Sequence, residues 1–249
     1  FRDIPNFISK IELKRKSNKH VSRFLETQLT DTEFSKLCEK IKNKKLKLII
    51  TPFDEVSVEK AVNFDVDIIK IASCSANDWP LIEKITKYNK PIIFSTGGQP
   101  IQEIDKTYSF LSHRQKKISI LHCVSTYPTK INEAQLNQIQ NLKKRYSNTV
   151  VGYSGHEDPD NLTICKVAVG LGAKVFERHI GIPTNKIKLN AYSMNIKQTE
   201  KWIESINQAK LTISDKKFKF ITNEEKNSIK LLQRGVFLNK SIKRGKKIK

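Results

Sequence analysis

The sequence lacks paired cysteines, long apolar runs and a secretory signal, which are the marks of disulfide-rich, membrane and secreted proteins. Its four cysteines form no Cys-x-x-Cys pair, so neither a cysteine zinc site nor a disulfide framework is predicted, and we expect free, buried thiols in a reducing compartment. No apolar run approaches the roughly 20 residues that span a bilayer. No secretory signal is visible either. We therefore expect a cytoplasmic protein without membrane contact.

Acidic residues are too few to balance the basic ones. The chain has 46 Lys and Arg against 25 Asp and Glu, a formal charge of +21. The cations are mostly Lys in Lys- and Asn-rich helices, without interleaved aromatic residues or a nucleic-acid-binding motif. A compositional bias explains them, and part of the excess can attract anionic substrates. We therefore expect no nucleic acid partner; the alternative, a basic nucleic-acid-associated protein, predicts binding that falls steeply with salt.

Apolar, β-rich runs alternate with amphipathic segments along most of the chain. A chain of 249 residues, 38% of them hydrophobic, is long enough to bury a full core. Consecutive strand ends lie 22 to 31 residues apart, which leaves room for one helix and two loops each time. The predicted strands span residues 46–51, 67–73, 91–96, 118–124, 149–154 and 173–178. The predicted helices span residues 30–44, 57–64, 79–88, 101–112, 133–146, 158–171 and 196–211.

This alternation fits either a doubly wound parallel sheet or a (β/α)8 barrel. Polar residues recur at nearly every strand end, as at Thr51, Thr96 and Ser154. A single crevice in an open sheet would not need chemistry on all of them, whereas a barrel gathers every strand end on one face. We therefore predict an α/β fold of the (β/α)8 TIM barrel type.

Only six of the eight barrel strands can be placed, so we expect this chain to lack the first two. The chain opens at Phe1 without Met, and residues 1–28 predict a βα-loop and a helix but no clean strand. Residues 226–234 predict a helix, and residues 235–238 predict the first strand of a new β-rich unit. We expect a partial barrel domain at residues 1–212, then a linker and a truncated second domain at residues 213–249.

Two histidines each follow directly on a predicted strand. His156 comes after the strand at 149–154, and His179 comes after the strand at 173–178. In one parallel barrel the C-terminal ends of these strands lie side by side, where two imidazoles can share a divalent metal. The alternative is that each histidine caps its strand or is a satisfied core residue. The pair favours an enzyme with its chemistry at this face.

Six short motifs lie at or beside the ends of the predicted strands, and a seventh follows the last of them. They are Thr51-Pro-Phe-Asp54, Lys70-Ile-Ala-Ser73, Lys90-Pro-Ile-Ile-Phe-Ser-Thr-Gly-Gly98, Leu121-His-Cys-Val-Ser-Thr-Tyr-Pro128, Val151-Gly-Tyr-Ser-Gly-His156, Glu177-Arg-His179 and Tyr192-Ser-Met194. Each motif is weak alone, but in this order and spacing they resemble the sialic acid synthase family over residues 46–211. The tail at residues 231–249 resembles the entry into that family's C-terminal antifreeze-like (SAF) domain.

The resemblance implies a phosphoenolpyruvate-dependent synthase of surface-polysaccharide precursors. Such enzymes join phosphoenolpyruvate to the open-chain aldehyde of an N-acetylated hexose, releasing phosphate and forming a nonulosonic acid. By this resemblance His156 and His179 bind Mn²⁺ or Mg²⁺, which activates the aldehyde. The residues implied to hold the phosphate and carboxylate of phosphoenolpyruvate are Lys70, Ser73, Ser125 and Ser154. The resemblance also implies a homodimer in which each antifreeze-like domain covers the partner's site.

The residue types agree with these roles. A trianionic substrate needs a Lys ammonium and several hydroxyl donors that converge on it, and Lys70 and the three serines all stand at strand ends. The alternative is a solvated Lys with ordinary capping hydroxyls. Two neutral imidazoles leave open positions on a metal for water and an aldehyde oxygen. Glu177 either orients His179 or pairs with a nearby Lys or Arg.

Two positions depart from the family's pattern. Where the family has Gly-Glu after the strand-end Ser, this chain has Cys74-Ser75, and where many members carry an Asp after the second metal histidine, it has Asn190. Ser75, Tyr127 and Asn190 are the candidate contacts of the sugar, so we expect an altered acceptor. The absence of carboxylates at these positions also fits an alternative, a degenerate barrel that binds a sugar or an anion without catalysis.

Overall fold

The sheet is a single layer of six parallel strands that follow chain order from β1 to β6. The computed structural model of the protein describes residues 27–185, 188–213 and 218–247. The strands are β1 (Ile49–Ile50), β2 (Ile68–Ile71), β3 (Ile92–Ser95), β4 (Ile118–Cys123), β5 (Val150–Gly155) and β6 (Phe176–Arg178). All six predicted strands are therefore present, in the predicted order.

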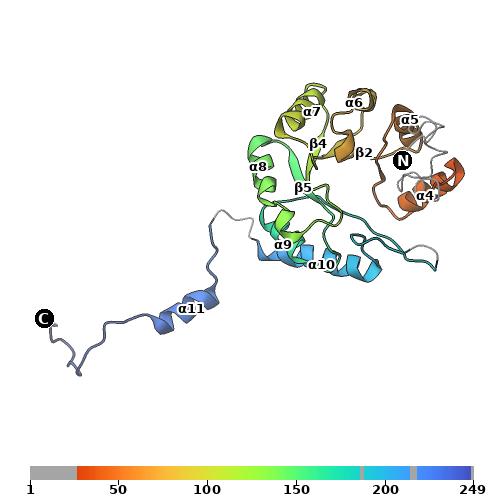
Figure 1. Cartoon of the computed structure of the whole chain (residues 1–249). Helices are drawn as coiled ribbons and strands as arrows, with labels where there is room; N and C mark the ends of the chain where they lie inside the picture. The colour runs from red at the N-terminus through yellow and green to blue at the C-terminus, as the bar shows by residue number, and fades with distance from the viewer. Residues whose placement is uncertain (1–26, 186–187, 214–217, 248–249) are drawn as a thin grey trace. The chain divides into compact units, whose positions relative to one another are not determined.

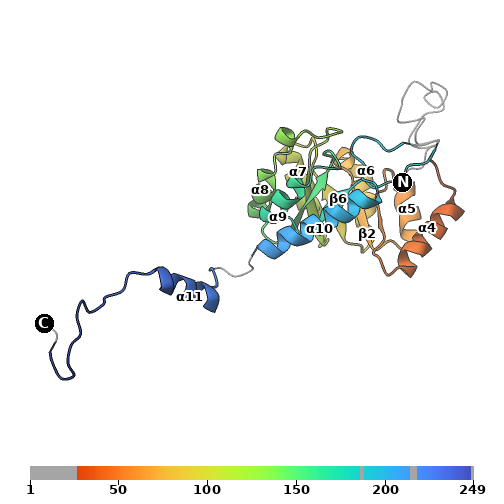
Figure 2. The same cartoon turned by 90° about the horizontal axis from the view of Figure 1, so that it is seen from below.

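Helices cover the outer side of this sheet, which curls into a half-barrel (Figure 1). They are α4 (Asp31–Asn43), α5 (Glu55–Asn63), α6 (Trp79–Thr86), α7 (Ile101–His113), α8 (Asn137–Arg145), α9 (Thr163–Gly170) and α10 (Ile196–Thr212). Figure 2 shows α10 beside β6, where Trp202 packs edge-on against Phe176 at a centroid distance of 6.2 Å. The prediction of a parallel α/β architecture is confirmed.

Local capping signals in the sequence start several of these helices. Thr30 and Glu33 form a capping box at α4, in which the Thr30 side chain accepts from the Glu33 backbone and Glu33 accepts from the Thr30 backbone. Asp54 accepts from the Ser57 backbone N–H at the start of α5, and Asp78 accepts from that of Leu81 at α6. Each cap satisfies backbone donors that the first helical turn leaves without partners.

Side-chain alternation divides each strand between two faces. Ile69 and Ile71 of β2 and Tyr153 of β5 belong to the hydrophobic core that the helices cover. Lys70 lies between the two isoleucines and therefore projects to the opposite, concave face, and Ser154 does so beside Tyr153. The concave face of the half-barrel thus receives the polar residues of these strands.

Two predicted helix boundaries are wrong. The helix expected at 158–171 begins only at Thr163, because Asp158 and Asn161 use their side chains to accept from the backbone N–H groups of Asp160 and Thr163 in tight turns. The helix expected at 133–146 begins only at Asn137. A short 3₁₀ turn, Ile131–Glu133, precedes it, and Gln135 has a φ of 44°, which no helix continues through.

Residues from Leu211 onward form a separate compact unit. It holds the helix α11 (Asn223–Leu232), which the sequence predicted at 226–234. The strand predicted at 235–238 is not formed: Val236 and Phe237 are exposed and no strand pairs with them among the described residues. A strand needs a neighbour to pair its backbone and bury one face, and this segment has none. The prediction for residues 1–28 falls almost wholly outside the described residues.

Within the described parts of the chain, no helix is both long and apolar enough to cross a bilayer.

Candidate functional site

Strand register places His156 opposite His179. Gly155 on β5 pairs with Arg178 on β6, so the residues that follow each of them are the next neighbours across the sheet. The two imidazole rings lie 5.2 Å apart between centroids. His156 is 5% exposed, whereas His179 is exposed at the edge of the sheet. The two histidines are therefore close enough for both to face one small ligand.

The surroundings of His156 keep its imidazole neutral. Burial, reinforced by the nearby His179, lowers the pKa of His156 to about 4. Its Nδ1 lies 3.3 Å from the carbonyl oxygen of Val124. A neutral ring that donates from Nδ1 to this carbonyl leaves the lone pair of Nε2 for another partner. This is the protonation state that a metal ligand requires.

Two tyrosines pack edge-on against the histidines. The Tyr127 ring lies 4.4 Å from the His156 ring, and the Tyr192 ring lies 5.0 Å from the His179 ring, both between centroids. The two tyrosine rings are themselves 5.3 Å apart. Burial raises the pKa of Tyr127, and the nearby Ser125 opposes that rise. The histidine pair thus has an aromatic wall with polar tips, which suits the mixed surface of a sugar.

A second group of polar side chains lies two residues before the histidines along the strands, on the same face of the sheet. Cys123, Ser154 and Glu177 are direct neighbours in the register of β4, β5 and β6. The Ser154 hydroxyl donates to Glu177 Oε1 over 2.9 Å, and Lys70 Nζ lies 3.4 Å from the same oxygen. Of the two roles considered for Glu177, pairing with a lysine is the one that the structure displays.

Ser73 and Ser125, the other two serines expected to bind phosphoenolpyruvate, lie close to this polar group beside Gly97. The backbone N–H of Gly97 donates to Ser73 Oγ over 3.0 Å. A Cβ on Gly97 would lie 2.2 Å from Ser125 Oγ and 3.0 Å from both Ser73 Oγ and Cys123 Sγ. Only glycine lets these three side chains approach one another here.

Cys123 lies at the centre of the polar group, although no motif in the sequence had pointed to it as a site residue. Burial, the largest effect, raises the pKa of its thiol, and the neighbouring Ser73, Ser154 and Lys70 oppose that rise. Its Sγ lies 3.9 Å from His156 Nδ1. Cys123 ends β4 and Ser125 follows in the loop beyond it, so strand alternation alone did not place the thiol among the serines. The four residues expected to bind phosphoenolpyruvate therefore surround one buried thiol.

Two of the candidate sugar contacts make local bonds. Ser75 is 4% exposed in the 3₁₀ turn Ser73–Ser75, and its hydroxyl lies 4.0 Å from the Cys74 sulfur. The Asn190 side chain accepts from the backbone N–H of Tyr192 over 3.2 Å, which helps to hold that tyrosine beside His179. Contact of Ser75 or Asn190 with a sugar stays a prediction.

The chemistry of the donor set fits a divalent metal with open positions. Two imidazoles are good ligands for such an ion, and one of them is neutral with Nε2 available. Within the described residues, no group of three or more His, Cys, Asp and Glu side chains is placed to hold a metal. Two imidazoles alone leave the remaining coordination positions of such an ion open, for example to water or substrate.

A cavity of about 490 Å³ adjoins the polar group. It lies between the ends of β3 and β4 and the helices α7 and α8, and Cys123 and Ser125 contribute to its wall together with Thr96 and Gln99. Neither His156 nor His179 lines it. The cavity therefore adjoins the site at Cys123 and Ser125, and neither imidazole forms part of its wall.

Comparison with known proteins finds one family over most of the chain. A profile described as the NeuB family matches residues 5–218. The N-acetylneuraminate-9-phosphate synthase of Drosophila melanogaster is 39% identical over 127 residues, which are 51% of this chain and 34% of that protein. The N,N'-diacetyllegionaminic acid synthase of Campylobacter jejuni is 32% identical over 204 residues, 78% of this chain and 58% of that protein. The chain thus spans between a third and three fifths of the length of these relatives.

A solved structure shares the fold closely. The putative spore coat polysaccharide biosynthesis protein E of Chromobacterium violaceum superposes with a TM-score of 0.90 at 40% identity, over 94% of this chain and 70% of that one. The curled half-barrel described above is therefore the arrangement that a related protein adopts.

Proposed function

We propose that this chain, which belongs to the NeuB family, acts as a nonulosonic acid synthase. Its named relatives are synthases of sialic, legionaminic and pseudaminic acids. The proposed substrates are phosphoenolpyruvate and the open-chain aldehyde of an N-acetylated hexose. A carbon–carbon bond forms between phosphoenolpyruvate C3 and the aldehyde carbon, water adds at C2, and phosphate leaves, so the products are a nonulosonic acid and inorganic phosphate.

The observation that carries this proposal is the polar group on the concave face. Lys70 contributes an ammonium, and Ser73, Ser125 and Ser154 contribute hydroxyls around the Cys123 thiol. A trianionic substrate is held by such a set, since charge-assisted hydrogen bonds are roughly twice as strong as neutral ones. Lys70 is only 11% exposed in its side chain, so its charge acts on a bound anion with little screening by water.

The histidine pair supports a divalent metal, Mn²⁺ or Mg²⁺, as the proposed cofactor. His156 and His179 would hold it beside the Tyr127 and Tyr192 rings. Such an ion supplies a Lewis acid that polarises the aldehyde oxygen. The sugar is thereby assigned to the histidine end of the site and phosphoenolpyruvate to the Lys70 end.

We also propose how the two units of the chain fit the architecture of the complete protein. The half-barrel is taken as part of a (β/α)8 barrel, and the unit from Leu211 onward as the start of an antifreeze-like domain. The protein would act in the cytoplasm, in the synthesis of surface-polysaccharide precursors, as a homodimer and without nucleic acid or membrane partners.

Phosphate release tests the proposal directly. The purified protein is incubated with Mn²⁺, phosphoenolpyruvate and a panel of N-acetylated and diacetamido hexoses, and phosphate is measured over time. We expect release that requires both phosphoenolpyruvate and one of the sugars. No release with any sugar, from protein that binds Mn²⁺ through its histidines, would favour the degenerate barrel instead.

A further inference from the structure

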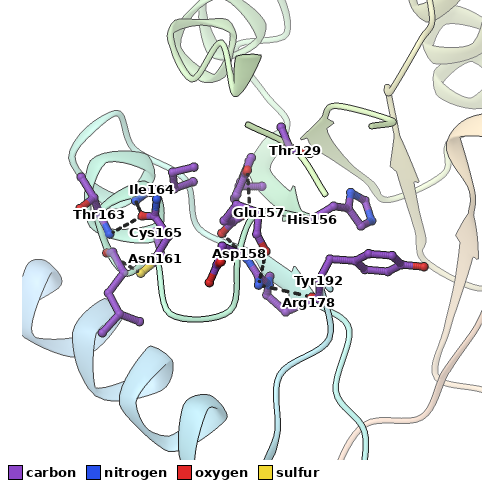
Figure 3. A network of polar contacts seen from close by, with 12 residues as sticks. Thr129, His156, Glu157, Asp158, Asn161, Thr163, Ile164, Cys165, Arg178 and Tyr192 are labelled. Carbon is purple, nitrogen blue, oxygen red and sulfur yellow. Dashed lines mark hydrogen bonds and ion pairs between the residues drawn. The ribbon is translucent and has the colours of Figure 1, made fainter. Parts of the chain in front are cut away.

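A buried ion pair lies directly behind the two histidines. Glu157 follows His156 in the chain, Arg178 precedes His179, and the two side chains form an ion pair in which each is 1% exposed (Figure 3). Removing both charges from water costs several kcal/mol per ion unless good geometry and further hydrogen bonds compensate for it. Because this cost offsets most of what the pair contributes to the free energy of unfolding, we expect the pair to have a role other than stabilising the fold.

Additional contacts hold the pair in one arrangement. The Tyr153 hydroxyl donates to Glu157 Oε2 over 3.0 Å. Arg178 Nη2 donates to the backbone carbonyl of Glu157 over 2.9 Å and approaches that of Tyr192 at 3.5 Å. Figure 3 shows the Arg178 guanidinium between these groups. One side chain thereby links the segment after His156 to the segment that carries the Tyr192 ring.

Glycine at position 155 makes room for the carboxylate. A Cβ on Gly155 would lie 2.4 Å from Glu157 Oε2. The Glu157 side chain thus folds back against the backbone that immediately precedes His156. The carboxylate is therefore packed against the segment that carries the histidine.

The pair acts on the imidazoles from the far face of the sheet. Arg178 lies between Glu177 and His179 on one strand, and alternation turns its side chain to the face opposite theirs. Glu157 and Arg178 therefore touch neither the Lys70 group nor the space between the histidines. They contact the site through the backbone of the two strand ends, and the Arg178 charge adds a smaller effect that lowers the pKa of His156.

We propose that Glu157 and Arg178 are positioning residues that fix the spacing of His156 and His179 and so set the affinity of that pair for a divalent cation. This inference rests on the metal site of the proposed function. Groups that orient metal ligands typically change metal affinity by about 10- to 100-fold when they are altered. An ion pair that ties both strand ends together has the same effect on two ligands at once.

The first test variant is Arg178→Lys. It keeps the buried positive charge but lacks the planar fork, so it cannot hold the Glu157 carboxylate and the two carbonyls together. A double variant, Glu157→Gln with Arg178→Met, removes both charges and leaves none unpaired. The matched control is Arg145→Lys, because Arg145 pairs with Asp105 beside the Tyr146 hydroxyl, on α7 and α8 away from the histidines.

The readout is Mn²⁺ binding to the purified protein, followed by electron paramagnetic resonance. Loss of the free-ion signal gives the dissociation constant, and pulsed spectra report imidazole nitrogens coupled to the ion. Thermal unfolding of each variant confirms that it is folded. We expect wild type and Arg145→Lys to show two coupled nitrogens, and Arg178→Lys and the double variant to bind at least about tenfold more weakly with altered couplings.

The measurements on wild type and on the variants distinguish failure of the positioning role from failure of the metal site. If the folded Arg178→Lys and double variants bind Mn²⁺ with wild-type affinity and couplings, the positioning role is wrong and the metal site stands. If wild type itself shows no coupled imidazole nitrogen, the metal part of the proposed function fails, and the positioning role fails with it.

Discussion

Lys70 Nζ on β2 lies 3.4 Å from Glu177 Oε1 on β6, although β3, β4 and β5 separate these two strands in the sheet. Neighbouring strands lie about 4.8 Å apart, so a flat sheet would hold β2 and β6 about 19 Å apart. The ion pair can form only because the sheet curls and brings both side chains to its concave face. The curl thus brings together the end of the site that we propose to bind phosphoenolpyruvate.

Replacing Lys70 with Met should weaken phosphoenolpyruvate binding at least about tenfold, since a desolvated ammonium–phosphate contact contributes about 2 kcal/mol or more. The variant also leaves Glu177 without its cation, and that carboxylate then repels the substrate. Calorimetric titration measures the affinity, and we expect a smaller effect on the sugar. Lys84→Met, on the outer helix α6, is the control. Wild-type affinity in Lys70→Met would remove Lys70 from the site.

Replacing either histidine should abolish metal-dependent turnover and leave the fold intact. Neither His156 nor His179 belongs to the hydrophobic core, and two imidazoles are the donors that the described residues offer. Phosphate release in the presence of Mn²⁺ and thermal unfolding are measured together for His156→Ala and His179→Ala. His113→Ala, at the exposed end of α7, should behave as wild type. Full turnover in either site variant would contradict the assignment.

Gly152→Ala should destabilise the protein, whereas Gly170→Ala should not. A Cβ at Gly152 would lie 2.2 Å from the Val175 carbonyl, which already accepts from the Tyr153 backbone. Forcing these backbones apart costs about 1–3 kcal/mol. Gly170 ends α9 with open space around it, and Ala there should be neutral or stabilising by up to ~1 kcal/mol. Denaturant unfolding of both variants checks the contrast, which equal losses of stability would refute.

The acid sensitivity of folding should depend in part on Asp105. The hydrogen bond from Arg145, with a second from Tyr146, holds the pKa of Asp105 below its ordinary value of 3.8. A carboxyl whose pKa is lowered by folding stabilises the protein above its unfolded pKa and loses that contribution as the pH falls through the folded value. Asp105→Asn should therefore be less stable than wild type near neutral pH, with the difference shrinking in acid.

Urea unfolding from pH 3 to pH 7 measures this difference. Glu103→Gln on the same helix is the control, because Glu103 forms only an exposed pair with Lys106, which contributes about 0–1 kcal/mol. A difference between wild type and Asp105→Asn that grows as the pH falls would have the wrong sign.

The preferred sugar should differ from N-acetylmannosamine. The resemblance to the sialic acid synthase family implies carboxylates where this chain has Ser75 and Asn190. A site built for one set of hydroxyls rejects sugars that leave its polar groups unpaired. Comparing kcat/KM for phosphate release over the sugar panel tests this. N-acetylmannosamine as the best substrate by a clear margin would refute the altered acceptor.

The sequence alone was enough for the order of the elements and for the two histidines. Alternation of apolar runs with amphipathic segments predicted all six strands, because side-chain periods of 2.0 and 3.6 residues are local properties of the chain. The position of His156 and His179 directly after predicted strands indicated a shared edge. Helix ends were less accurate, as at Thr163, because turn-forming side chains competed with the helix there.

Tertiary structure alone decided which polar groups meet. Nothing local in the chain pairs Lys70 with Glu177, places Cys123 among the serines, or buries Glu157 against Arg178. These contacts join residues that are distant in sequence or whose side chains lie on the face of the sheet opposite the concave one. Strand register and sheet curl place them, and both result from the packing of the whole half-barrel and not from any one segment of the sequence.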